Sequence, residues 1–105
     1  MSWNVVVLPK AHRDYLHALE YLSGFYPGTP LQFRNEYKKT LRQLEDSPRS
    51  CPIYYAFPDY RRALISKYTM LYKIDEEHHE IYVHRILRSS WDIPGRLQEE
   101  EKSAL

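Results

Sequence analysis

The spacing of apolar residues changes from a helical to an alternating period near the middle of the chain, and this change constrains the fold most. Residues 11–44 repeat apolar side chains at helical spacing, which is typical of helices that bury one face. Residues 63–87 alternate apolar and polar side chains instead, which is typical of half-buried strands. A chain that changes once from helices to strands is expected to be an α+β domain, with its helices packed on a sheet.

In the first half of the chain, residues that typically begin or end helices and strands indicate where each element starts and stops. Residues 3–8 are β-branched and apolar, so we expect a short N-terminal strand there. Residues 11–23 are expected to form a helix. Thr29 is expected to cap a second helix, with Pro30 at its first helical position and Gln32 completing a capping box, and this helix is expected to end at residues 46–48. The pair should form an antiparallel hairpin that packs on the sheet through an apolar face made of Tyr15, Leu19, Leu22, Phe33, Tyr37, Leu41 and Leu44.

Three strands are expected in the second half, over residues 63–65, 68–74 and 81–87, with a polar hairpin connection at residues 75–79. The predicted architecture is a short N-terminal strand, the helix hairpin and a three-stranded antiparallel run that completes one sheet. Because the helices cover one face, the other face is expected to remain open to a ligand or partner.

Size and charge limit the classes of function. With 105 residues the chain is one domain, which we divide into a folded part over residues 1–96 and a polar tail over 97–105. Its net charge is +1, although four cations and no acid fall between residues 61 and 74. The lone Cys51 and the absence of an 18-residue apolar run favour a cytoplasmic protein without disulfides. No glycine-rich phosphate loop is present, and His78-His79 is better explained as a solvated loop than as a metal site.

One group of residues on the last strand is suited to chemistry. Under strict alternation His84 and Arg88 share a face, Arg85 lies on the opposite face, and Arg61 stands at the entrance to an earlier strand. Such a surface could hold RNA phosphates and supply a general acid or base near neutral pH. An ordinary solvated sheet face explains the same residues, and on chemistry alone it is the stronger interpretation.

The order of motifs along residues 5–94 resembles toxins of the RelE/ParE superfamily. Residues 57–65 and 68–75 resemble the family's central pair of strands, in which a Tyr-Arg strand precedes one that ends in Asp. Residues 33–48 resemble its second helix and proline exit. The end of the match, residues 83–94, resembles the ParE branch, through the identities at Arg85, Ile86, Leu87, Asp92, Ile93 and Pro94.

This resemblance implies a toxin that a cognate antitoxin neutralises by folding over it, in a pair of the plasmid-stabilising type. The RelE branch cleaves ribosome-bound mRNA without a metal, whereas the ParE branch acts on DNA gyrase. The chain carries Thr69 where the nucleases tend to have an arginine, and it has Trp91 and Ile93 where they place a tyrosine. It therefore resembles ParE more closely.

Three hypotheses remain open. In the first, the chain binds DNA gyrase through Trp91, Asp92 and Ile93. In the second, it cleaves mRNA on the ribosome with Arg88, His84 and Arg61. In the third, it is inactive and retains only antitoxin binding, for which the resemblance suggests Arg62 and Arg85. No cofactor and no metal are expected in any of them.

Overall fold

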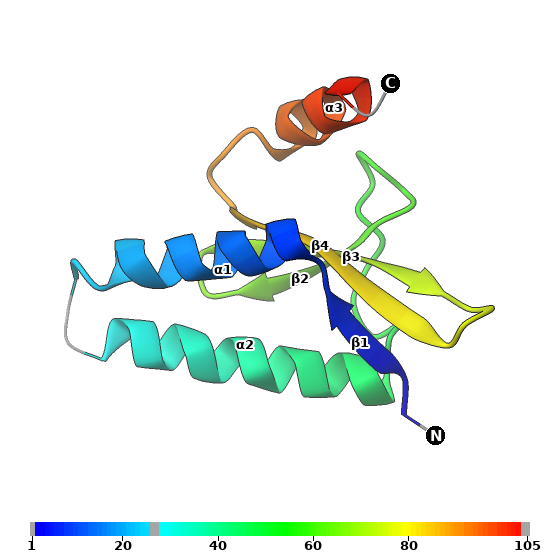
Figure 1. Ribbon diagram of the computed structural model, residues 1–105, viewed down its shortest axis with the longest axis horizontal. Helices are drawn as coiled ribbons and strands as arrows, with labels where there is room; N and C mark the ends of the chain where they lie inside the picture. Colours follow the sequence, from blue (N-terminus) through cyan, green and yellow to red (C-terminus); the bar gives the residue numbers. More distant parts are fainter. Residues whose placement is uncertain (1, 26–27, 104–105) are drawn as a thin grey trace.

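The computed structural model describes residues 2–25 and 28–103, and it has the predicted order of elements as far as the last strand, after which comes a helix that was not predicted. Strand β1 (Asn4–Val7) leads into helix α1 (Pro9–Leu22), and helix α2 (Thr29–Asp46) returns antiparallel beside it (Figure 1). Strands β2 (Arg61–Ile65), β3 (Tyr68–Asp75) and β4 (Glu80–Arg88) follow, and helix α3 (Ile93–Ser103) ends the described part.

The four strands form one sheet in the order β1-β4-β3-β2. Strand β1 pairs parallel to β4, while the other pairs are antiparallel. Because β1 has only four residues, it covers β4 from Glu80 to Val83 and leaves the second half of β4 at the sheet edge. The predicted fold class is confirmed.

The main core lies between the helix pair and the sheet. Tyr72 is fully buried there, and its hydroxyl donates a hydrogen bond to the carbonyl of Pro48 at 2.7 Å. The predicted apolar face of the helix pair is confirmed, because its buried or partly buried members all pack into this core: Tyr15, Leu19, Leu22, Phe33, Tyr37, Leu41 and Leu44.

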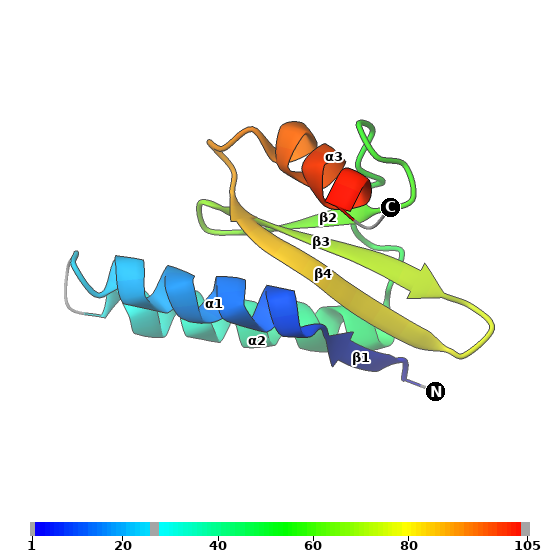
Figure 2. The same ribbon diagram turned by 45° about the horizontal axis from the view of Figure 1, so that its top comes forward.

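A second core lies on the opposite face of the sheet, where the sequence predicted an open surface. Figure 2 shows α3 on that side of the sheet and the pair α1 and α2 on the other. Ile93 and Leu97 of α3 are buried against Leu71 and Leu87 of the sheet. Helix α3 therefore covers part of the face, and the predicted division at residue 96 falls inside this helix.

The start of α2 differs from the predicted capping box. The N-cap position is Gly28, which has a positive φ of 92°, and no side chain caps the helix. Thr29 is already the first helical residue, so its hydroxyl is one position too late to cap. A glycine suits the left-handed backbone by which the chain enters α2.

A β-bulge in β4 overturns the strict alternation predicted for this strand. Arg85 lies opposite Leu71 and Val83 lies opposite Tyr72, so His84 has no partner residue on β3. The extra residue reverses which face each later side chain occupies. Ile81, Val83 and Ile86 consequently enter the main core. Leu87, which strict alternation would place on the same face as Ile81 and Val83, enters the second core instead.

Candidate functional site

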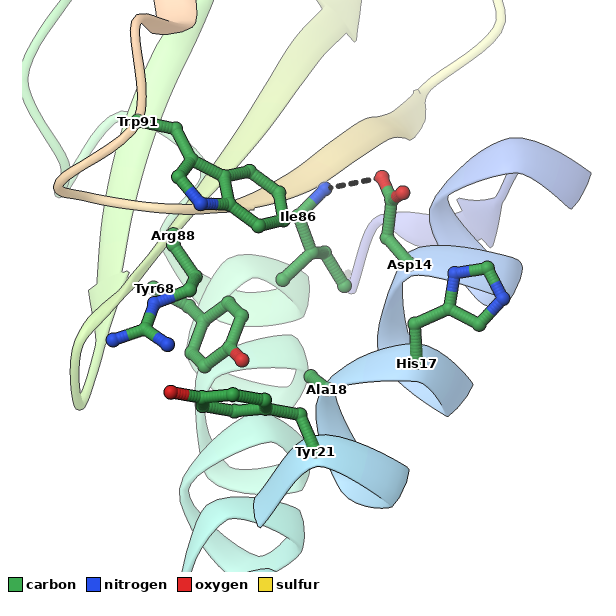
Figure 3. A pocket seen from close by; sticks show the side chains of 8 residues that line it. All are labelled: Asp14, His17, Ala18, Tyr21, Tyr68, Ile86, Arg88 and Trp91. Carbon is green, nitrogen blue, oxygen red and sulfur yellow. Dashed lines mark hydrogen bonds between the residues drawn. The ribbon is translucent and has the colours of Figure 1, made fainter.

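A pocket of about 320 Å³ lies where β4 ends against the second half of α1. Figure 3 shows Trp91 on one wall and Tyr21 of α1 on the opposite wall, with Arg88 and Tyr68 between them. Asp14, which also belongs to α1, stands at the far end of the pocket. The pocket exists because β1 ends at Val7 and leaves this part of β4 uncovered.

The Arg88 guanidinium lies 4.6 Å from the centre of the Tyr21 ring, in a cation–π contact. Within residues 2–25 and 28–103 no carboxylate pairs with it. Tyr68 lies beneath and is buried, and this burial raises the pKa of its phenol although the Arg88 charge opposes the shift. The Tyr21 ring thus positions the positively charged Arg88 guanidinium, and this side chain lines the pocket.

Two further hollows adjoin this pocket and share the Arg88 side chain with it. One, of about 340 Å³, is bounded by Tyr21, Phe25 and Lys67, and the other, of about 510 Å³, by Leu64 and Lys67. We call the continuous surface around Arg88, formed by Tyr21, Phe25, Leu64, Lys67, Tyr68 and Trp91, the Arg88 groove.

Arg85 is engaged within the molecule. Its Nε donates to Oδ2 of Asp14 at 2.7 Å, its Nη2 donates to Oδ1 at 3.1 Å, and its Nη1 donates to the Glu100 carboxylate. The side chains of Arg85 and Asp14 are each 12% exposed. Arg85 therefore connects α1, β4 and α3, which is a structural arrangement rather than a free binding surface.

His84 does not share a face with Arg88, contrary to the prediction. Its ring meets the Tyr60 ring edge-on at 5.3 Å, and Tyr60 belongs to the second core. Burial lowers the pKa of His84, and the nearby Lys73 lowers it further. The neutral imidazole is consequently favoured, on the side of the sheet away from Arg88.

Arg61 and Arg62 lie at the start of β2. Arg61 Nη1 donates to the Cys51 carbonyl at 2.8 Å and so holds the segment that precedes the strand. Arg62 is partly buried and lies next to Arg61 on the opposite face of the strand, across from Leu71. The proposed nuclease set of Arg88, His84 and Arg61 is therefore not brought together: the bulge separates His84 from Arg88, and Arg61 lies at the other end of β2.

The three residues proposed for gyrase contact have different surroundings. Trp91 is 42% exposed and stacks against the Arg96 guanidinium at 4.2 Å. Asp92 Oδ1 accepts a hydrogen bond from the Gly95 amide at 3.2 Å, at the first turn of α3. Ile93 is buried in the second core, so Trp91 is the member that offers apolar surface to a partner.

Thr69 occupies the position where the nucleases of the family tend to carry an arginine. It is buried, and its hydroxyl shares a hydrogen bond of 2.8 Å with the Ser89 hydroxyl. An uncharged, satisfied side chain at this place supplies no cation for a phosphate.

Tyr21 and Asp14 belong to this site and were not predicted. Tyr21 lies on the exposed side of α1 in the sequence pattern, and only its contact with Arg88 gives it a role. In the part of the chain that the structure describes, no group of three or more His, Cys, Asp or Glu side chains is arranged for a metal ion. No described helix is long and apolar enough to cross a membrane.

The model of a known protein family matches most of the chain. The model of the ParE toxin of the type II toxin–antitoxin system parDE matches residues 5–93. A comparison with curated proteins gives no match.

Solved structures share the fold at low sequence identity. The chromosomal ParDE toxin–antitoxin system from P. aeruginosa aligns with a TM-score of 0.70 and 14% identity, over 83% of this chain and 96% of that one. The isolated E. coli RelE toxin aligns with a TM-score of 0.63 and 18% identity, over 99% and 100%. The toxin–antitoxin complex RelBE2 from Mycobacterium tuberculosis aligns with a TM-score of 0.60 and 21% identity, over 84% and 99%.

Proposed function

The chain belongs to the ParE toxin family of type II toxin–antitoxin systems, and from this membership we propose that it inhibits DNA gyrase by direct contact and that a cognate antitoxin neutralises it. The observation that carries the proposal is the match to the ParE model over residues 5–93. The antitoxin is the partner that the structural relatives suggest, because they include toxin–antitoxin complexes.

The choice of a binding mechanism over a nuclease mechanism rests on the separation of the cationic and titratable side chains. Metal-independent cleavage of RNA needs a general base and a charge-stabilising cation on the same phosphate. Here His84 and Arg88 lie on opposite faces of the sheet, and the side chain at position 69 is an uncharged threonine. These residues do not converge on one phosphate.

We assign the gyrase contact to Trp91. Asp92 orients the first turn of α3 through its hydrogen bond to the Gly95 amide, and Ile93 packs this helix against the second core. An exposed aromatic side chain beside a cation is the type of residue that dominates protein interfaces. Of the two arginines proposed for the antitoxin, Arg62 remains a proposed contact. Arg85 has both its carboxylate partners within the chain, so we assign it a structural role.

A ribosome-dependent mRNA endonuclease is the second candidate function. It is favoured by one observation, the Arg88 guanidinium that no described carboxylate neutralises. In that mechanism Arg88 would stabilise the charge that develops on the phosphate, and its removal would cost ~100–1000-fold in cleavage rate. An inactive family member that retains antitoxin binding is the third.

The test combines induced expression with a purified gyrase assay. We expect the native chain to cause filamentation and an SOS response, and to inhibit DNA supercoiling in vitro. Trp91→Ala should relieve both effects more than Arg88→Ala, because it removes an exposed interface aromatic. Tyr55→Ala is the matched control, since Tyr55 is an aromatic side chain that is 88% exposed and lies outside the Arg88 groove.

Primer extension on total RNA from the same cultures distinguishes the alternatives. Discrete cleavages within codons, present with the native chain and absent with Arg88→Ala, would replace the gyrase mechanism with the nuclease. Normal growth at a verified expression level, with no change in supercoiling, would favour the inactive member.

A further inference from the structure

His84 is partly buried on the sheet face that α3 covers in part. Its ring meets the Tyr60 ring edge-on at 5.3 Å. Tyr60 belongs to the second core, as do Ile93 and Leu97 of α3. Histidine is the side chain whose charge normally changes between pH 5 and 8. A proton taken up by His84 would therefore place a positive charge at the margin of the core that holds α3.

The Tyr60 ring already holds one cation. The Lys73 Nζ lies 4.6 Å from the ring centre, in a cation–π contact. An imidazolium at His84 would bring a second positive charge against the same ring, and like charges this close repel each other. In agreement with this geometry, burial lowers the pKa of His84 and the Lys73 charge lowers it further. The cluster of Tyr60, Lys73 and His84 therefore favours a neutral imidazole.

The neighbouring strands offer no opposite charge to an imidazolium at His84. On β4 itself, the Glu80 carboxylate accepts hydrogen bonds from Tyr82 and Asn4. On β2, Arg62 lies on the same sheet face and adds a further cation. Among the described residues no carboxylate forms an ion pair with His84.

The charged side chains that the structure describes on α3 do not compensate either. Glu100 pairs with Arg85 of β4, and the Arg96 guanidinium stacks on an aromatic ring. Glu99 and Lys102 have exposed side chains. A charge on His84 would consequently be opposed by its surroundings on every element that borders it.

Helix α3 is the element that such a charge would affect first. Its described residues contribute Ile93 and Leu97 to the second core, and Glu100 adds ion pairs with Arg85 and Lys10. The main core lies on the opposite face of the sheet and is built from other residues. Elements with few buried apolar contacts open at lower free energy than the rest of a fold. Helix α3 can therefore separate from the sheet while the main core keeps its packing.

We propose that His84 is a proton-sensitive switch for the docking of α3. Uptake of one proton by its imidazole, beside Lys73 on the Tyr60 ring, releases α3 from the sheet and moves the turn that carries Trp91 away from β4. This inference goes beyond the proposed function and does not depend on which target the chain binds.

The direction of the pH dependence follows from the two states of His84. In the released state the imidazole is solvated and has its ordinary pKa of 6.5, whereas docking lowers this pKa. The released state therefore binds the proton more readily, so docking is undisturbed above pH 6.5 and weakens as the pH falls toward the lower pKa of the docked state. Because one proton is linked, the released fraction should rise by at most about tenfold per pH unit.

Trp91 fluorescence in the full chain provides the first test. In a Trp3→Phe background Trp91 is the remaining tryptophan. Its emission should change as the pH falls from about 8 to 5, and His84→Gln should abolish this change. His17→Gln is the matched control, because His17 lines the pocket beside Trp91 but lies outside the second core.

Hydrogen exchange measured by NMR locates the opening in the chain. Protection factors, which are corrected for the pH dependence of intrinsic exchange, should fall below pH 6.5 for the amides of α3 by up to about tenfold per pH unit. Those of α2 should stay constant, because α2 packs into the main core.

Lys73→Gln tests the switch without changing His84. The NMR titration of the His84 imidazole should give a pKa below 6.5 in the native chain and a value closer to 6.5 in Lys73→Gln. The loss of α3 protection should become shallower in this variant. Lys38→Gln, which removes a charge from an exposed position on α2, should leave both measurements unchanged.

Four results would overturn the proposal. In the native chain, they are an imidazole of His84 that titrates at or above pH 6.5, α3 protection that does not fall with pH, and equal losses in α2 and α3, which indicate global unfolding. The fourth is a fluorescence change that persists in His84→Gln. If His84→Gln does not fold, the native titration and the Lys73→Gln variant still decide.

Discussion

The Asp14 carboxylate accepts three hydrogen bonds where β4 departs from its regular register. Two come from the Arg85 guanidinium, and the third comes from the Ile86 backbone amide at 2.9 Å. That amide faces the open edge of the sheet, because β1 has already ended. One side chain on α1 thus neutralises a mostly buried cation and satisfies a backbone donor at the bulge.

Asp14→Asn should lower the free energy of unfolding by about 2–4 kcal/mol, because it removes one partner of a mostly buried ion pair. The control is Glu76→Gln, which breaks the pair of Glu76 with Arg49 on the surface, where the two side chains are 66% and 50% exposed. That change should cost less than about 1 kcal/mol. Urea unfolding of both variants measures the difference, and equal losses would show that the Asp14 bonds add little.

Stability should fall at high pH through Tyr37. Burial, reinforced by the neighbouring Tyr15, raises the pKa of Tyr37 to about 12 from its ordinary value of 10.0. The unfolded chain therefore ionises first, so the stabilisation is complete below pH 10 and is lost as the pH rises toward 12. The loss should approach ~1.4 kcal/mol per pH unit within this window.

Urea unfolding at several pH values between 9 and 12 checks this dependence. Tyr37→Phe should make it shallower but not abolish it, because burial also raises the pKa of Tyr72. Tyr55→Phe is the control, since Tyr55 is 88% exposed. An unchanged slope in Tyr37→Phe would contradict the prediction.

Among the elements, α3 changes the structure most relative to the predicted fold, because the sequence did not predict this helix. It places Ile93 and Leu97 over Leu71 and Leu87, and its Glu100 reaches Arg85 and Lys10. The sheet is consequently covered on both faces, by two helices on one side and in part by α3 on the other (Figure 2). Helix α3 also determines where Trp91 stands, because the short turn before it connects Trp91 to β4.

Leu97→Ala should lower the free energy of unfolding by roughly 2–4 kcal/mol, because Leu97 is buried in the second core. Gln98→Ala, at an exposed neighbouring position on α3, should change it by less than about 0.5 kcal/mol. Thermal and urea unfolding provide the comparison. Equal, small effects would indicate that α3 contributes little to the stability of the fold.

As a whole molecule, the protein combines a small main core with a groove that remains open. A domain of this size buries only about 60–65% of the surface of its unfolded chain, so its stability margin is narrow. The exposed aromatic side chains of the Arg88 groove are an apolar surface that the chain does not cover within its described residues.

Binding of the antitoxin should therefore raise the melting temperature. A partner that binds only the folded state adds about 2.7 kcal/mol of stability at a hundredfold excess over its dissociation constant. Differential scanning calorimetry at increasing partner concentration should show a progressive rise. A melting temperature that does not change when the adjacent gene product is added would contradict the prediction that this product binds the folded chain and stabilises it.

The sequence by itself determined the fold class, the order of the elements from β1 to β4 and the apolar face of the helix pair. These features depend on local periodicity, because a side chain's position on a helix or regular strand follows from its place in the repeat. Leu44 and Tyr37 could be assigned to the core for this reason, and both are buried there.

Only the tertiary structure decided the site. The bulge at His84 separates it from Arg88, yet nothing in the local pattern marks an extra residue, because a bulge depends on the pairing with β3. Arg85 meets Asp14 across 71 positions of sequence, and Arg88 meets Tyr21 only because α1 packs beside the uncovered half of β4. Contacts of this kind follow from how elements dock, which the spacing of residues along the chain does not record.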